Sequence, residues 1–352
     1  MMIVPAAIRR ARQSGMTLTE LLIATAAGLL VMLTAVSTLS AARQGVNTVD
    51  AASQLRDNAR FASDIIQRLA VQAGFEDLAS ASAPYAGSQA QYAQINQTAI
   101  EELQPNVFGH DNATPKAADP LHTATPRSAG DGGHGSDVLI LQYQAARAGI
   151  DPSGASDSDR SMMTCAGNAP KLAPAGRQDR IYSILSVGKS VGNEPALMCT
   201  TRSESSGKPY TSPLIAGVES FQVLYGVDNV TPGAALAPGQ AASSIPNGYL
   251  RASQLTVPGD LNATHANWRR VRSLRIGMVL RGPERSAQDA ATLQTLFPLG
   301  SRYASAADPG SSYTASDGRL RQTVIFTVHL RNCQNQGYQP GASTLACDVA
   351  LP

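Results

Sequence analysis

The sequence predicts an α+β protein, in which a long N-terminal helix with a membrane-spanning first half packs on an antiparallel β-sheet head with long loops. Two observations predict this class. The run from Leu21 to Ala42 contains no charged residue. Beyond residue 135, short segments of alternating or clustered apolar residues follow one another, separated by Gly- and Pro-rich stretches.

The helix comes first in the chain. Met16 to Val36 is 21 residues, and a helix of that length measures roughly 30 Å, the thickness of a bilayer core. Apolar residues then recur every three or four positions as far as Ala73. The pattern therefore predicts one helix from Thr17 to Ala73, within a segment 16–74 whose part 16–36 spans the membrane.

Glycines mark the end and the weak points of this helix. Gly74 is a natural stop, and Gly28 and Gly45 are positions where the helix can bend. An independent coiled coil is the alternative, but no strict heptad persists.

A short basic segment precedes the helix. Residues 1–15 contain Arg9, Arg10 and Arg12 and no acid, and they end at Gly15. Five residues further lies Glu20, a carboxylate at the mouth of an apolar run. Such a group costs about 2.5 to 3.5 kcal/mol at the centre of a membrane and less near the interface, and it is usually paired. No partner for Glu20 exists within its own apolar run.

This region resembles the class III signal of type IV prepilins. The resemblance is carried by the order of the features: a basic leader that ends at Gly15, then Met16, Thr17-Leu18 and Glu20, and then the apolar run. The resemblance implies that a prepilin peptidase cleaves after Gly15 and N-methylates the new amine of Met16. Met16 stands where the family most often has Phe. The resemblance also implies that Glu20 forms an assembly salt bridge with the amine of a neighbouring subunit.

Other interpretations of this region remain open. A secretory signal peptide also has a basic start, and small residues at Ser40 to Ala42 offer a cut, although its apolar core is normally about 7 to 15 residues. A simple anchor explains the length but neither Gly15 nor Glu20. Glu20 can also act only as a favourable charge near a helix N-terminus.

Charge argues against nucleic acid as a partner. The leader holds three of the 28 basic residues, so 25 basic residues face 26 acidic ones in the rest of the chain. A chain without an excess of positive charge does not bind nucleic acid by electrostatics alone. The one local cluster of basic residues that could bind it is Arg269, Arg270, Arg272 and Arg275. The alternation of this segment favours a solvated face of a strand instead.

Four cysteines allow three pairings. If the signal exports the chain, disulfides are expected, and the favoured pairing is sequential, Cys165 with Cys199 and Cys333 with Cys347. Neither pair has the C-x-x-C spacing of a zinc or redox site. We expect no metal and no cofactor.

Composition divides the chain after the helix into three parts. We expect a long irregular insertion at residues 75–135, a β-rich globular head at residues 136–332, and a tail with a cysteine pair at residues 333–352. Asp137 to Tyr143 is the first firm strand. Further elements are expected at 180–187 and 196–200, paired through a turn at 188–195, and at 214–227, 249–255, 271–281 and 320–331, with Pro-, Gly- and Ala-rich loops between them.

No catalytic site assembles in the sequence. The five histidines are scattered without a ligand spacing. Asp151, Asp157 and Asp159 share a loop, but the glycine and closing glutamate of a calcium loop are missing, which favours a solvated loop. We expect no enzyme activity.

Segments after the N-terminal signal indicate one family among the type IV pilins. The helix end at 58–75, the block 218–228 that ends Tyr-Gly-Val-Asp, the strand 268–281 and the closing Leu330-Arg331-Asn332 resemble, in this order, the PilW family of minor type IV pilins. The resemblance implies a structural subunit that helps to initiate and assemble a pilus, a surface fibre used in twitching motility. Its partners would be the prepilin peptidase, the major pilin, other minor pilins, a tip adhesin and the inner membrane, with the head first periplasmic and then at the cell surface. A type II secretion pseudopilin of the J type and a membrane-anchored periplasmic binding protein remain as alternatives.

Overall fold

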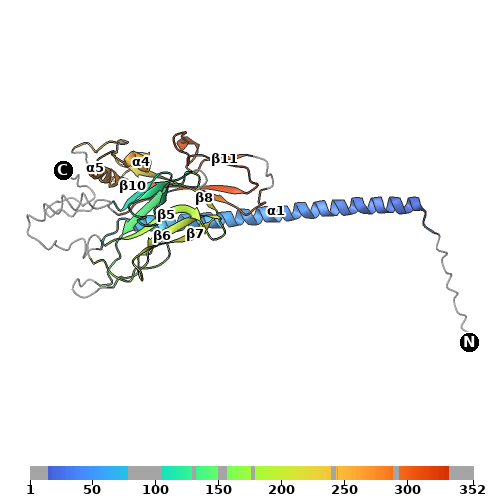
Figure 1. Cartoon of the computed structure of the whole chain (residues 1–352), viewed down its shortest axis with the longest axis horizontal. Coiled ribbons are helices and arrows are strands. Elements are labelled where there is room, and N and C mark those ends of the chain that lie inside the picture. Colours follow the sequence, from blue (N-terminus) through green and yellow to red (C-terminus); the bar gives the residue numbers. More distant parts are fainter. Residues whose placement is uncertain are drawn as a thin grey trace, which may run out of the picture.

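The computed structural model describes residues 15–77, 105–128, 132–149, 157–175, 179–238, 243, 245–287 and 293–332. It shows a long helix, α1, and a β-rich head that packs on the second half of this helix (Figure 1). The predicted α+β class is therefore confirmed.

Helix α1 spans Leu18–Gln72, which is 55 residues. Thr17 caps its start and Ala73 its end, so the prediction of a helix over residues 17–73 is confirmed. Gly74 follows with a φ of 78°, a left-handed conformation that ends the helix at little steric cost. The first half projects away from the head (Figure 1). The second half buries one stripe of side chains, namely Ala51, Leu55, Ala59, Ala62, Ile66, Leu69 and Ala70.

The larger sheet has five antiparallel strands in the order β1-β4-β5-β6-β7. The strands are β1 (Val107–His110), β4 (Val138–Tyr143), β5 (Ile181–Lys189), β6 (Pro195–Arg202) and β7 (Pro209–Ala216). All six residues of β4 are buried, so this strand is covered on both faces.

The second sheet has four antiparallel strands in the order β13-β10-β8-β9. The strands are β8 (Val218–Val227), β9 (Gly248–Leu250), β10 (Val271–Arg281) and β13 (Arg321–His329). Between them lie the short helices α4 (Ala252–Leu255) and α5 (Leu261–Trp268). Smaller elements are the pairs β2 (Ala113–Pro115) with β3 (Ala124–Pro126) and β11 (Gln294–Leu296) with β12 (Tyr313–Ala315), and the 3-10 turn η1 (Ser301–Tyr303).

A single residue carries the chain from one sheet to the other. Gly217 lies between β7 and β8 with a φ of 84°, and a Cβ at this position would lie 2.7 Å from the carbonyl oxygen of Arg281. The sequence predicted one element over residues 214–227. The structure has two strands there, because this left-handed glycine turns the chain out of the first sheet and into the second.

The segment before β4 joins the two sheets directly. The amide of Asp137 donates to the carbonyl of Phe221 (2.8 Å), and the Asp137 carboxylate accepts from the amide of Val223 (2.8 Å). Ser136 Oγ accepts from the amide of Phe221 (3.0 Å). Burial raises the pKa of the Asp137 carboxyl well above its usual range. The two residues before β4 are therefore hydrogen-bonded to β8, which links the first sheet to the second.

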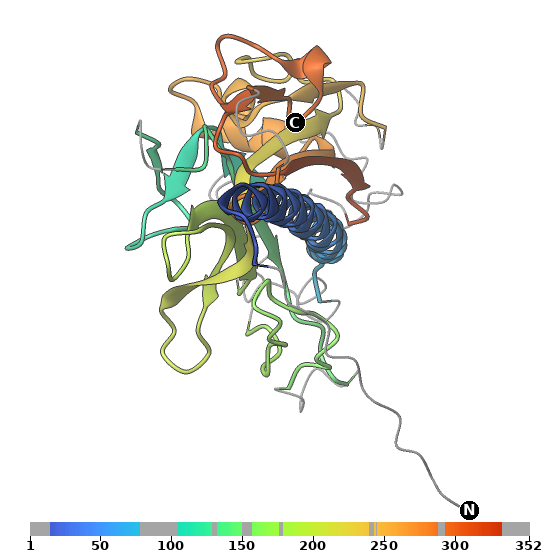
Figure 2. The same cartoon turned by 90° about the vertical axis from the view of Figure 1, so that its right-hand side faces the viewer.

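Helix α1 contacts strands of both sheets, namely β4 and β7 of the first and β10 and β13 of the second. In the view nearly along the helix, the larger sheet and β13 lie on different sides of it (Figure 2). The end of α1 is tied to the end of the last strand, because Asn332 Nδ2 donates to the carbonyls of Val71 (3.0 Å) and Ala73 (3.2 Å).

The prediction that residues 75–135 are irregular was wrong for the part that contains β1, β2 and β3. Residues 78–104 of this insertion lie outside the described residues. β1 therefore precedes the strand expected to be first. β1 is only four residues long and stands among Pro-, Asn- and Gly-rich neighbours, so its apolar pattern is too short to detect in the sequence.

Candidate functional site: the start of the N-terminal helix

The first turn of α1 is closed by a capping box between Thr17 and Glu20. The amide of Glu20 donates to Thr17 Oγ1 (3.3 Å), and the amide of Thr17 donates to Glu20 Oε2 (3.1 Å). The Thr17 hydroxyl also donates to Glu20 Oε2 (3.1 Å). Two backbone donors that a helix start leaves unsatisfied thereby gain acceptors. Within the single chain, the Glu20 carboxylate is bound by the residue three positions before it.

The scissile bond proposed from the sequence lies directly before this capping box. Gly15 and Met16 are both exposed, and a Cβ on Gly15 would meet nothing within 4 Å. The side chain of Met16 is 67% exposed. The two residues that flank the proposed cleavage site are therefore exposed, and the basic residues of the leader lie outside the described residues.

The helix that follows exposes its apolar side chains. An 18-residue window of α1 has a mean hydropathy of 2.1, and none of its residues is buried inside the protein. The large exposed side chains here are Leu18, Leu21, Leu22, Ile23, Leu29, Leu30, Val31, Met32, Leu33, Val36 and Leu39. By length and composition, α1 can cross a membrane.

Four hydroxyl groups in this apolar half bond to carbonyls of the helix itself. Thr25 Oγ1 donates to the Leu22 carbonyl (3.0 Å), and Thr34 Oγ1 donates to the Val31 carbonyl (2.8 Å). Ser37 and Thr38 also bond to carbonyls of the preceding turn. A hydroxyl that bonds its own backbone is cheaper to place in hydrocarbon than an unsatisfied one. Glu20 remains the only charged side chain between Thr17 and Ala42.

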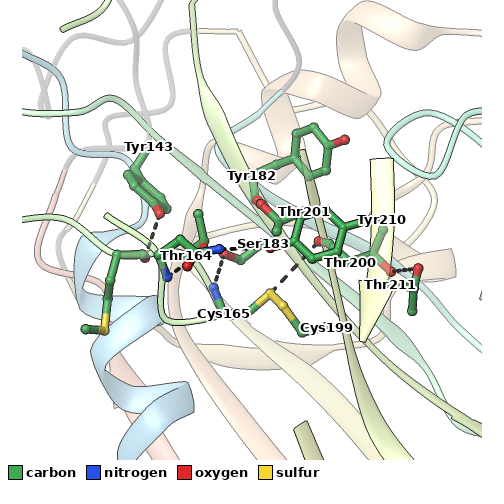
Figure 3. Close-up of a disulfide and its surroundings, with 12 residues drawn as sticks. Tyr143, Thr164, Cys165, Tyr182, Ser183, Cys199, Thr200, Thr201, Tyr210 and Thr211 are labelled. Carbon is green, nitrogen blue, oxygen red and sulfur yellow. Dashed lines mark hydrogen bonds between the residues drawn. A yellow bond between two sulfur atoms is a disulfide. The ribbon is translucent and has the colours of Figure 1, made fainter. Parts of the chain in front are cut away.

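The first predicted disulfide is present in the structure. Cys165 and Cys199 are bonded across a sequence separation of 34, and both are buried. Figure 3 shows the loop residue Cys165 beside β6, with its amide donating to Ser183 Oγ on β5 (3.0 Å). The disulfide therefore fixes the loop before β5 against the middle of the larger sheet. Cys333 and Cys347 lie outside the described residues.

The arginine cluster does not form the solvated strand face that the sequence predicted. Arg269 and Arg270 are 5% and 6% exposed, and Arg270 pairs with the buried Asp228 (Nη1 to Oδ2, 3.1 Å). Arg272 donates to the carbonyl of Ser243 (2.7 Å). The guanidinium of Arg275 lies over the ring of Tyr303 (5.1 Å to the centroid). These four arginines hold the head together and form no exposed basic patch.

Other sequence candidates also occupy structural positions. Asp159 Oδ1 accepts from the amide and hydroxyl of Ser161 (2.8 and 2.7 Å), while Asp151 lies outside the described residues. His329, the last residue of β13, is exposed. Across the residues that the structure describes, no group of three or more His, Cys, Asp or Glu side chains is placed to hold a metal ion.

Sequence reasoning missed two features. One is the capping box, although the pattern Thr-x-x-Glu before an apolar run is its known signature. The other is a buried ion network in which Glu219 on β8 binds Arg281 on β10 (2.9 Å) and Arg321 on β13 (2.7 Å). The second could not be read from the sequence, because its members are as far apart as residues 219 and 321.

These observations define an α+β protein whose N-terminal helix is long and apolar enough to cross a membrane. Residues 181–332 match the family model PilW, described as Type IV Pilus-assembly protein W. The match runs from the start of β5 to the end of the described chain, and it confirms the predicted PilW resemblance over this range.

A solved structure, the type IV-like pilin TTHA1219 from Thermus thermophilus, is also similar. It is 16% identical, the alignment covers 70% of this chain and 99% of that chain, and the TM-score is 0.28, which is too low to establish a common architecture. No curated protein matches this sequence.

Proposed function

We propose that this chain is a minor pilin that takes part in initiating and assembling a type IV pilus. One observation carries the proposal: a helix whose apolar first half is exposed begins three residues after an exposed glycine and has one carboxylate in its first turn. A stably folded head does not need such a helix, whereas a subunit held by its helix first in a membrane and then in a fibre does. The match of the head to the PilW model supports the same conclusion.

Processing comes first in this proposal. A prepilin peptidase cleaves between Gly15 and Met16 and methylates the amine of Met16. Because this bond lies just outside the helix, cleavage leaves the fold of α1 intact. The product begins with a positive charge two residues before the helix and four residues before Glu20.

Assembly then uses this pair of charges. The amine of one subunit and the Glu20 carboxylate of its neighbour are each costly alone in apolar surroundings and acceptable together. In the single chain the Glu20 carboxylate accepts hydrogen bonds from Thr17. The salt bridge between subunits would therefore replace these hydrogen bonds, and the carboxylate would have donors both before and after assembly. Thr17 thereby lowers the cost of keeping Glu20 in the membrane before assembly.

The proposal extends to location and partners. The chain would be single-pass in the inner membrane with a periplasmic head, and would later join a cell-surface pilus. Its partners would be the prepilin peptidase, the major pilin, other minor pilins and a tip adhesin. A structural role without catalysis accords with this assignment.

A type II secretion pseudopilin of the J type would share the signal and the helix, and genes for secretion machinery beside this gene would favour it. A membrane-anchored binding protein would keep its leader. The PilW match favours the pilus subunit over both.

Intact-mass and N-terminal analysis of the protein from its native membrane tests the proposal. We expect a chain that begins at Met16 and carries one methyl group on its amine. The variant Gly15→Leu should remain uncleaved, because the peptidase must accommodate the residue before the cut, and Gly15→Ala serves as the milder control. A native chain that begins at Met1 or near Ala42 would contradict the assignment.

A further inference from the structure

The charge-free part of α1 indicates where a membrane would end on the helix. No charged residue occurs from Leu21 to Ala42, and these 22 residues span roughly 33 Å of helix. That length matches the hydrocarbon core of a bilayer, which is about 30 Å thick. Glu20 and Arg43 stand at the two ends of this part. The outer edge of the hydrocarbon would therefore lie close to Arg43.

The head begins at almost the same level of the helix. Gln44 Nε2 donates to the carbonyl of Ala287 (3.4 Å), and Thr48 Oγ1 donates to the carbonyl of Ser286 (2.9 Å). Among the described residues, no other hydrogen bond between α1 and the head lies nearer to the start of the helix, and the first half of α1 leaves the head on this side (Figure 1). Thr48 is about 7 Å beyond Arg43 along the axis, and the headgroup layer of a bilayer is roughly 5 to 8 Å thick on each side. The turn that contains Ser286 would therefore lie at the depth of the headgroups.

This turn, residues 283–286, is fixed to the second sheet. The buried Ser286 Oγ donates to the carbonyl of Pro283 (2.7 Å) and accepts from the amide of Leu320 (2.9 Å). The amide of Gly282 donates to the carbonyl of Leu320 (2.8 Å). Residues 283–285 are exposed. The sheet and α1 together therefore hold these three residues at the membrane surface.

Arg285 occupies a backbone conformation that suits glycine. Its φ is 59°, in the left-handed region where a side chain adds strain and glycine has none. Because Arg285 is exposed, packing inside the head does not account for its presence. A residue that its surroundings hold in a strained conformation points to a role for its side chain. The guanidinium group supplies that role if an anion lies beside the turn.

Two arginines are the uncompensated charges at this level of the molecule. Glu284, the acidic residue of the turn, is paired with Arg319 (Oε1 to Nη2, 3.0 Å). Arg43 and Arg285 are both exposed, and neither forms an ion pair within the described part of the chain. The next acid along α1 is Asp50, seven residues beyond Arg43 and about 10 Å further from the membrane. Phospholipid phosphates are the complementary anions at the depth of the two arginines.

We propose that Arg43 and Arg285 bind the headgroups of anionic phospholipids at the outer surface of the membrane that α1 spans. The inference rests on the proposed function for the presence of that membrane, and it adds a second attachment, made by the head. The bilayer is the favoured partner because the position of α1 in the membrane brings it to the turn without any further component. Each arginine near an anionic surface contributes about a fivefold preference for that surface.

A photoreactive residue in the turn identifies what lies against it. Benzoylphenylalanine replaces the exposed Pro283 in the full chain, which is inserted in nanodiscs of equimolar phosphatidylcholine and phosphatidylglycerol with identical acyl chains. Mass spectrometry after irradiation separates the adducts of the two lipids, and we expect phosphatidylglycerol adducts to be about fivefold more abundant or more. The same probe at Ser161 should give no lipid adduct. Its neighbour Met163 bonds to Gln72 (2.8 Å), which lies roughly 43 Å beyond Arg43 along the helix.

Two arginines with the same backbone conformation supply the variant and its matched control. Arg285→Gly removes the charge, and the φ of 59° suits glycine, so the turn should keep its fold. Arg160 is also exposed and left-handed, with a φ of 58°, but it lies in the same loop as Met163. With the probe at position 283, Arg285→Gly should lower the ratio of phosphatidylglycerol to phosphatidylcholine adducts about fivefold. Arg160→Gly, and Arg285→Lys, which keeps the charge, should leave the ratio unchanged.

Three results in nanodiscs would overturn the proposal: no phospholipid adduct at position 283, equal capture of the two lipids, or the native ratio in Arg285→Gly. In native membranes the same probe should again capture phospholipid. Capture of a protein in its place would show that another chain occupies the turn, which also overturns the proposal. If Arg285→Gly does not give a native circular dichroism spectrum, Arg285→Gln replaces it with the same expected ratio.

The nanodisc experiment is independent of cleavage and assembly, so it separates this proposal from the proposed function. A native chain that begins at a methylated Met16 but gives no lipid adduct would retain the proposed function and remove the contact of the head with lipid. Selective capture of phosphatidylglycerol by a chain that is never cleaved after Gly15 in its native membrane would do the reverse.

Discussion

Arg321 and Glu219 form a buried ion pair that connects the outer strand of the second sheet to its interior. Arg321 Nε lies 2.7 Å from Glu219 Oε2, and their side chains are 2% and 5% exposed. Arg281, on the strand between them, binds the same carboxylate at 2.9 Å. Two guanidinium groups therefore depend on one buried carboxylate.

Removing that carboxylate should destabilise the head strongly. Glu219→Gln leaves two arginines partly unpaired in a buried site, and we expect a loss of about 3 to 5 kcal/mol in the free energy of unfolding. Urea denaturation followed by circular dichroism measures it. Glu284→Gln is the matched control, because Glu284 also binds an arginine, Arg319, but its side chain is 80% exposed. The control should change stability by less than about 1 kcal/mol, and equal effects of the two variants would contradict this account.

Acid should lower the stability of the same region by protonating Asp317, which binds Arg321 at the edge of the ion network. Hydrogen bonds from Arg321 lower the pKa of the Asp317 carboxyl to about 2, so the ionised form is favoured in the folded state. This contribution is present above the usual carboxyl pKa of about 3.8 and is lost as the pH falls through about 4 to 2. The stability difference between the native chain and Asp317→Asn should therefore shrink over that window. A difference that stays constant from pH 6 to pH 2.5 would refute the assignment.

The disulfide should matter through the loop that it closes. Cys165 and Cys199 are 34 residues apart, and closing a loop of that length stabilises the folded state by roughly 3 to 4 kcal/mol in the chain-entropy model. The double variant with both cysteines changed to alanine should unfold at correspondingly lower urea. The native chain measured with and without a reductant is the control for effects of the alanines themselves. Unchanged stability after verified reduction would show that the packing of β5 and β6 holds the loop without the bond.

The first turn of α1 supplies a prediction about assembly. Glu20→Ala should be cleaved normally, because Gly15 is unaffected, but recovered in sheared pili at about one tenth of the native amount or less, since the neighbouring amine loses its partner. Thr17→Val should show a smaller loss, and Thr17→Ser, which keeps the hydroxyl, should behave as the native chain does. Quantitative immunoblots of sheared and membrane fractions provide the measurement. Native recovery of Glu20→Ala would remove the salt bridge from the mechanism.

The helix and the longer strands were predictable because their patterns are local. The apolar spacing and Gly74 predicted α1 to within one residue at each end. The alternation from Val271 to Arg281 marked β10 correctly. In contrast, β7 was not predicted separately, because Pro209 and Pro213 are turn residues in most contexts and are tolerated here only at the edge of a sheet.

The environment of a charged side chain was harder to predict than its element. Arg270 stands in a pattern typical of a solvated face, but its partner Asp228 lies 42 residues earlier and is brought close only when β8 and β10 pair. Glu219 is likewise surrounded by arginines from two later strands. The alternation of apolar residues along a strand predicts which residues share a face. It does not predict whether another part of the chain covers that face.

The link between Asn332 and the end of α1 has a mechanical consequence. A pull along α1 enters the head at the helix and reaches β13, which runs in the same direction and is tied to α1 at both ends, through Ser286 and through Asn332. The load then acts along the nine-residue pairing of β13 with β10, so its hydrogen bonds are stretched together in shear. Strands loaded in this way must break all their bonds at once, whereas strands peeled from one end break them one by one. The head is thus arranged to resist traction along its own helix.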